Sequence, residues 1–140
     1  MNERSATRKD ALLLPLMLIY GAASLLHFMH NAIYLQDYPN LPVWLTAAAV
    51  VAAWLVVAAV GVLGYLLYSL VSRAAGLITI GAYAMLGFGG LDHYTAAPMS
   101  AHTVAMNLTI LLEGVTSAVL LVFVVRSAFA LRAQRSRAQG

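Results

Sequence analysis

Histidines are the residues of this 140-residue chain that are best suited to chemistry, and the chain contains no cysteine. The four are His27, His30, His93 and His102. The lack of cysteine excludes disulfides, thiolate metal sites and cysteine nucleophiles. Imidazole binds zinc, copper and iron, and two histidines three residues apart on a helix, such as His27 and His30, can point at one ion. The sequence therefore predicts a transition-metal site, to which His93 and His102 would supply the other ligands.

Carboxylates add to this set as further ligands, or as groups that orient an imidazole. Of the five aspartates and glutamates in the chain, the candidates are Asp37, Asp92 and Glu113. Glu113 stands inside a long apolar run, where a carboxylate is costly unless it is paired, protonated or hydrated. We expect it to act as a metal ligand or in a proton relay; the structural alternative is a protonated side chain bonded to a neighbouring group.

The identity of the metal stays open among copper, zinc and iron. Three methionines fall near the histidines, and thioether ligands would favour copper. They are Met29, Met99 and Met106. Each of them, taken singly, fits a packing role as well.

Two other functions fit the same residues. A b-type haem could bind between a histidine of the first apolar run and one of the third or fourth, with the glycines of 81–90 admitting the macrocycle. Alternatively, the histidines belong to an interfacial aromatic belt with Tyr34, Tyr38, Trp44 and Tyr94, and the protein is an accessory subunit of a larger membrane complex or a homo-oligomer. No phosphate-binding loop, nucleophile elbow or zinc-protease motif is present, so the sequence does not decide whether the protein is an enzyme.

The elements that must position these residues are membrane spans. The chain is 62% hydrophobic and 9% charged, whereas soluble domains have about 25% charged residues. Four apolar runs, at about 11–34, 43–68, 75–91 and 101–125, are each suited to crossing about 30 Å of hydrocarbon. Their short links predict one all-α domain over residues 1–140, an up-down four-helix transmembrane bundle.

Charge predicts the orientation of this bundle. All eight lysines and arginines fall in residues 1–10, at Arg73 or in residues 126–140, which are on one side of a four-span arrangement. The other side carries Asp37 and Asp92. The positive-inside rule then places both termini and their basic tails in the cytoplasm, and the protein in the cell's inner (plasma) membrane as a multi-pass protein. We expect the lipid bilayer, and no nucleic acid, to be the partner of these basic residues.

The first span has a second interpretation. Residues 2–24 also resemble a signal peptide, with a basic start, an apolar stretch and then small residues. Cleavage would remove half of the span. The apolar pattern continues to Leu35, which favours an uncleaved first helix.

Helical phase predicts where the polar residues point. At about 3.6 residues per turn, one stripe of the first span and one of the fourth are polar. The first stripe is Tyr20, Ser24, His27, Asn31 and Tyr34, and the second is His102, Met106, Thr109, Glu113 and Thr116. Because the first and fourth helices of a closed bundle adjoin, we expect the two stripes to meet inside it. We also expect Ser100 to cap the fourth helix and His102 to lie in its first turn.

Overall fold

The structure is a computed structural model that describes the backbone of residues 3–139 and the side chains of residues 11–137. Within these residues it contains helices and loops but no strand. Four helical segments are long and apolar enough to cross a membrane: Ala11–Ile33, Ala47–Val71, Arg73–Ala96 and Val104–Arg137. The prediction of an all-α protein with four potential membrane spans is therefore confirmed, and the chain is a multi-pass membrane protein.

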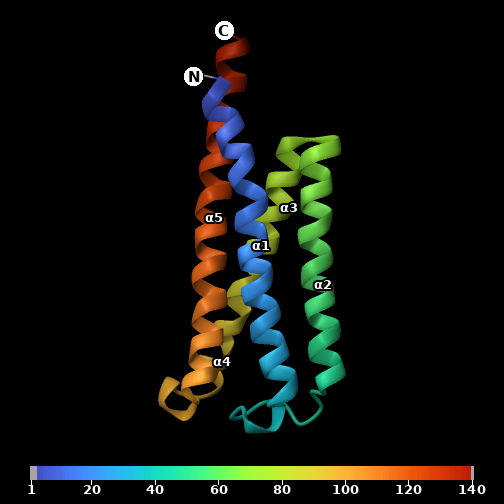
Figure 1. The fold of residues 1–140 in the computed structure, drawn as a ribbon, viewed down its shortest axis with the longest axis vertical. Coiled ribbons are helices and arrows are strands. Elements are labelled where there is room, and N and C mark those ends of the chain that lie inside the picture. Colours follow the sequence, from blue (N-terminus) through green and yellow to red (C-terminus); the bar gives the residue numbers. More distant parts are fainter. Residues whose placement is uncertain (1–2, 140) are drawn as a thin grey trace.

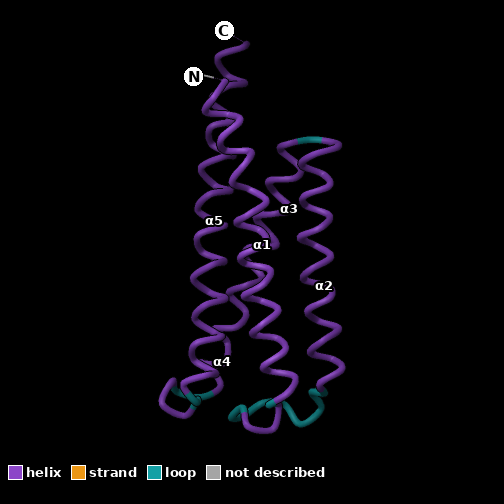
Figure 2. The backbone as a smooth tube through the Cα atoms, in the orientation of Figure 1, coloured by secondary structure: helices purple, strands orange, loops and turns teal. Residues whose placement is uncertain are grey.

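The long helices run side by side, and consecutive ones point in opposite directions (Figure 1). The order is α1 (Glu3–Ile33), η1 (Leu35–Asp37), α2 (Ala47–Leu66), η2 (Leu67–Val71), α3 (Arg73–Leu86), η3 (Gly87–Asp92), α4 (His93–Ala96), η4 (Met99–Ala101) and α5 (Val104–Gln139). Figure 2 shows that loops are confined to the ends of the long helices. Both termini lie at one end of the molecule, and we call the opposite end, where all four histidines lie, the histidine end.

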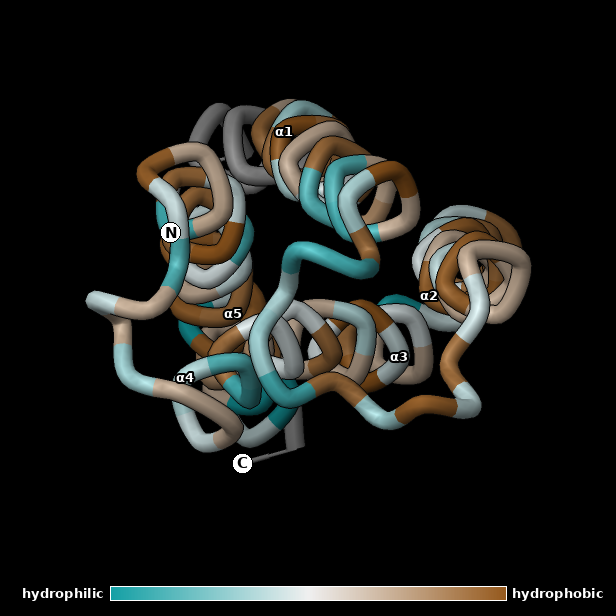
Figure 3. The backbone as a smooth tube through the Cα atoms, turned by 90° about the horizontal axis from the view of Figure 1, so that it is seen from below, coloured by the Kyte–Doolittle hydropathy of each residue, from teal (hydrophilic) through white to brown (hydrophobic). Residues whose placement is uncertain are grey.

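Helix α1 packs against α5 and α2, and α3 packs against α2 and α5. Viewed along the helices, α1, α3 and α5 surround a common interior while α2 stands to one side (Figure 3). Helix α2 buries only Val50, Gly61 and Gly64. The interior is therefore built by α1, α3, α5 and the short elements that connect them.

The distribution of side chains is the reverse of that in a soluble protein. Large apolar side chains face outwards, as shown by exposed fractions of 63% for Leu18, 76% for Ile78 and 61% for Val115. The buried polar side chains are Ser24, His27, Asn31, His93, His102, Thr109, Glu113 and Ser117. Lipid chains can cover an apolar exterior, whereas intramembrane polar groups face the interior of a bundle.

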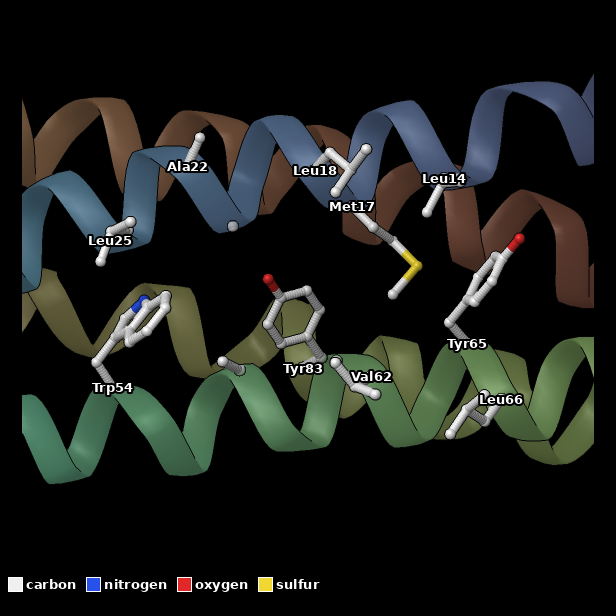
Figure 4. A pocket seen from close by; sticks show the side chains of 13 residues that line it. Leu14, Met17, Leu18, Ala22, Leu25, Trp54, Val62, Tyr65, Leu66 and Tyr83 are labelled. Atoms are coloured by element: carbon white, nitrogen blue, oxygen red, sulfur yellow. The ribbon is translucent and has the colours of Figure 1, made fainter.

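Apolar packing fills the half of the interior nearer the termini, where Leu13, Ile80 and Leu120 are fully buried. Tyr83 of α3 reaches between α1 and α2, and its hydroxyl points into the groove between these helices (Figure 4). A Cβ atom at Gly61 would lie 2.9 Å from the Tyr83 ring, so the glycine is what admits it. This groove has no histidine in its lining.

Two helices begin later than their apolar runs predict. Helix α2 starts at Ala47 rather than near 43, because the Thr46 hydroxyl accepts a hydrogen bond from the Ala49 amide at 3.2 Å and caps the helix. In α5 the cap is Thr103, whose hydroxyl accepts from the Met106 amide at 3.2 Å. The expectation that Ser100 caps this helix is wrong, since Ser100 lies in η4 and His102 is in an extended conformation before the helix.

Other bounds differ at the two ends. The third span, expected over 75–91, is an α-helix only to Leu86 and continues as η3 and α4. The segments 1–10 and 126–140, predicted as basic tails, continue the first and last helices, since α1 begins at Glu3 and α5 continues to Gln139. The side chains of 1–10 and 138–140 lie outside the described part of the chain, as does the backbone of residues 1, 2 and 140.

Candidate functional site

The centre of the site is a pair formed by His27 of α1 and Glu113 of α5. The His27 Nε2 atom lies 3.8 Å from Glu113 Oε2. The two residues are 2% and 1% exposed. Both belong to the polar stripes identified from helical phase, and the packing of α1 against α5 brings these stripes together.

The hydrogen bonds of Thr109 favour one tautomer of His27. The Thr109 hydroxyl donates to the Met106 carbonyl at 3.0 Å. Its oxygen is therefore an acceptor for His27 Nδ1–H, which is 3.4 Å away. With the proton on Nδ1, the Nε2 lone pair of a neutral imidazole faces Glu113. This is the form in which histidine binds metals.

Glu113 has only weak support from its neighbours. Neither of its carboxylate oxygens makes a hydrogen bond of good geometry with a described residue, and the Ser24 hydroxyl is close enough to stabilise the carboxylate. A buried carboxylate that is ionised and unpaired is strongly disfavoured. A cation between His27 Nε2 and the Glu113 carboxylate would therefore compensate the negative charge, and this cation can be a proton or a metal ion.

The backbone of η3 closes the third side of this pair. A Cβ atom at Gly90 would lie 2.9 Å from Glu113 Oε2 and 3.4 Å from His27 Nε2. A side chain at this position would press against both groups. Gly90 thus lets the chain between α3 and α4 approach the site closely.

His93 is the next polar group towards the histidine end. Its ring meets that of His27 edge to face, with centroids 5.4 Å apart. The Asn31 side-chain amide donates to His93 Nε2 at 3.1 Å. The Asn31 carbonyl oxygen Oδ1 is buried and has no partner among the described residues.

Tyr38 lies at the centre of the remaining histidines. Its ring centroid is 4.8 Å from that of His93 and 6.4 Å from that of His102. Burial raises the pKa of the Tyr38 hydroxyl, and this hydroxyl forms a hydrogen bond of 2.9 Å with His30 Nδ1. His102 Nδ1 in turn donates to the Pro98 carbonyl at 3.1 Å.

The structure divides the predicted ligands into three groups. His27, His93 and Glu113 lie together in the interior, whereas His30 and His102 bond to other partners around Tyr38. Asp37 and Asp92 are exposed. Among the described residues, no three histidine, aspartate or glutamate side chains are placed closely enough to hold a metal ion without rearrangement.

Sequence reasoning did not place Tyr38 in the site and named it only in the alternative of an interfacial belt, whereas the structure leaves it only 3% exposed. The chain after α1 turns back over the histidines, and a loop carries no helical phase from which this could be predicted. The turn is held by Asn40, which has a φ of 57° and donates to the Ala96 carbonyl at 2.9 Å. Asn40 is a residue type that accepts this left-handed conformation, and it was the one available signal.

No protein family, curated protein or solved structure matches this chain. A function for the site must therefore be argued from its own geometry.

Proposed function

We propose that this chain binds one transition-metal ion between His27 and Glu113, with His93 as a third ligand. The single observation that carries the proposal is the approach of two buried atoms, His27 Nε2 and Glu113 Oε2, to 3.8 Å, where neither carboxylate oxygen makes a hydrogen bond of good geometry with a described residue. We propose further that the up-down bundle lies in the plasma membrane with both termini cytoplasmic. The metal then sits towards the non-cytoplasmic leaflet.

The distance between His27 Nε2 and Glu113 Oε2 suits two atoms that bind the same metal ion. Zinc bonds to imidazole nitrogen and carboxylate oxygen are about 2.0–2.2 Å long, which puts two tetrahedral ligands about 3.4 Å apart. His27 Nε2 and Glu113 Oε2 are 3.8 Å apart. A contraction of a few tenths of an ångström would bring both atoms to bonding distance.

His93 completes the site by exchanging one partner for another. Its Nε2 atom accepts from Asn31, and a rotation of the ring would replace this hydrogen bond by a bond to the metal. Two imidazoles and one carboxylate suit zinc, copper or iron, with a fourth position open. A site of this kind serves either the handling of a metal or redox chemistry.

For a ligand pair that joins the first span to the third, the ring geometry supports a metal ion rather than haem. A haem held by two histidines needs a flat space between their rings. The closest pair that joins the first span to the third, His27 and His93, is in edge-to-face contact, with ring planes 77° apart. A macrocycle does not fit between these two rings.

Elemental analysis of detergent-purified protein tests the proposal. We expect about one metal ion per chain in the wild type, and its loss in His27→Ala and in Glu113→Gln. Asp37→Asn is the matched control, because it removes an exposed carboxylate outside the buried site and should leave the metal bound. Each variant is first checked by size-exclusion chromatography for a single folded species.

Two outcomes would overturn the proposal. One is a wild type that stays metal-free after incubation with copper, zinc and iron. The other is full metal content in both His27→Ala and Glu113→Gln. Larger membrane proteins that co-purify with a metal-free chain would instead support the accessory-subunit alternative.

A further inference from the structure

A second groove lies between α3 and α5, in the half of the molecule nearer the termini. It has a volume of about 420 Å³ and an apolar lining that includes Ile78, Gly81 and Ala128. Ile78 is 76% exposed, so the groove opens to the lipid side of the bundle. Its volume falls within the range of about 300–1,000 Å³ that is typical of small-molecule sites.

Two arginines of α5 line the groove towards the C-terminus. Arg132 and Arg135 are three residues apart and so share one face of the helix. Both are exposed, and they follow the last apolar groove residue, Leu131. Among the residues whose side chains the structure describes, the lining contains no carboxylate. Long arginine side chains at the end of a membrane helix extend their charged groups to the lipid headgroups.

We propose that this groove binds one anionic phospholipid. An acyl chain lies between α3 and α5, where the lining is apolar, and the phosphate lies at Arg132 and Arg135. Arginine suits this role because its planar guanidinium can bind two phosphate oxygens at once. Basic pockets between membrane helices on the cytoplasmic side are a recurring form of anionic-lipid site. The proposal is independent of the metal site, which lies towards the other end of the bundle.

Lipid titration followed by native mass spectrometry of the detergent-purified protein provides the test. The probes are phosphatidylglycerol and phosphatidylcholine with identical acyl chains. We expect phosphatidylglycerol to bind at least about 10-fold more tightly, and the Arg132→Gln, Arg135→Gln double variant to lose roughly 30-fold of that affinity. The matched control is the Arg126→Gln, Arg137→Gln double variant, which removes equal charge from outside the groove and should bind as the wild type does.

Groove-filling variants test the acyl-chain half of the site. Ala128→Leu and Gly81→Val narrow the groove but retain both arginines, and a Cβ atom at Gly81 is tolerated because its nearest neighbour would be 3.6 Å away. We expect either variant to weaken phosphatidylglycerol binding about 10-fold or more, because the acyl chain would lose part of its apolar contact surface.

Three results would overturn the lipid proposal. The first is equal affinity for the two lipids. The second is unchanged phosphatidylglycerol binding in both groove-filling variants. This would show that the arginines bind the headgroup but that the groove does not hold the acyl chain. The third is displacement of the lipid by millimolar inorganic phosphate, which would show a site for a free anion.

Discussion

At the residue scale, the Thr109 hydroxyl lies 3.4 Å from His27 Nδ1 and is positioned to orient this imidazole. Thr109→Val keeps the shape of the side chain but removes the acceptor for His27 Nδ1–H. Since partners of this kind fix the tautomer and orientation of a ligating imidazole, we expect metal affinity to fall by about 10- to 100-fold while the protein stays folded. Competition with a chelator of known affinity measures the change.

Thr116→Val is the matched control for this substitution. The Thr116 hydroxyl donates only to carbonyls of its own helix, those of Leu112 and Glu113 at 2.8 and 3.0 Å. We expect metal affinity close to that of the wild type. Equal affinities for both threonine variants would show that Thr109 does not position His27.

At the scale of single residues, the part of the site that lies on regular helices could be predicted. Periodicity placed His27, Thr109 and Glu113 on facing stripes, and the structure brings these three together. The same reasoning could not find Tyr38 or the close approach of Gly90. Both depend on where an irregular segment folds back, and helical phase holds no information about that.

At the scale of the elements, η3 contains a glycine that its packing requires and one that its packing does not. A Cβ atom at Gly87 would lie 2.6 Å from the Tyr20 ring and 2.7 Å from Ser117 Cβ, whereas one at Gly89 would have nothing within 4 Å. We expect Gly87→Ala to lower the free energy of unfolding by about 1–3 kcal/mol, because it overpacks a tight contact. Denaturation in mixed micelles followed by circular dichroism measures this.

Gly89→Ala serves as the control. We expect its free energy of unfolding to stay within about 0.5 kcal/mol of the wild-type value. The comparison is well matched because both glycines lie in η3 and neither has a positive φ. Equal losses in both variants would mean that backbone freedom, rather than contact with α1 and α5, is what η3 requires.

Helices could be predicted from the sequence more reliably than their ends. A membrane span must satisfy its own backbone hydrogen bonds, so a long apolar run is strong evidence for a helix. Hydropathy alone does not show where the helix starts, as Thr46 and Thr103 demonstrate by capping α2 and α5 inside the expected runs. It also does not show that the third span changes from an α-helix to a 3-10 helix at Gly87.

At the scale of the whole molecule, the chemistry is unevenly distributed. The buried imidazoles and Glu113 lie towards the histidine end, and the larger apolar cluster and the arginines of α5 lie towards the other. The two proposed sites share no residue. A variant that empties one should therefore leave the other intact, since distant sites act independently.

Because the chain contains no cysteine, single cysteines can report its orientation in the membrane. Gln36 and Ser100 are exposed at the histidine end, and Ser136 is exposed near the C-terminus. If the basic side is cytoplasmic, Gln36→Cys and Ser100→Cys should react with a membrane-impermeant maleimide in intact cells. Ser136→Cys should react only after the cells are opened. The reverse pattern would place His27 and Glu113 near the cytoplasmic leaflet, where the ion would have to come from the cytosolic metal pool, and would move Arg132 and Arg135 away from the leaflet richest in anionic lipid.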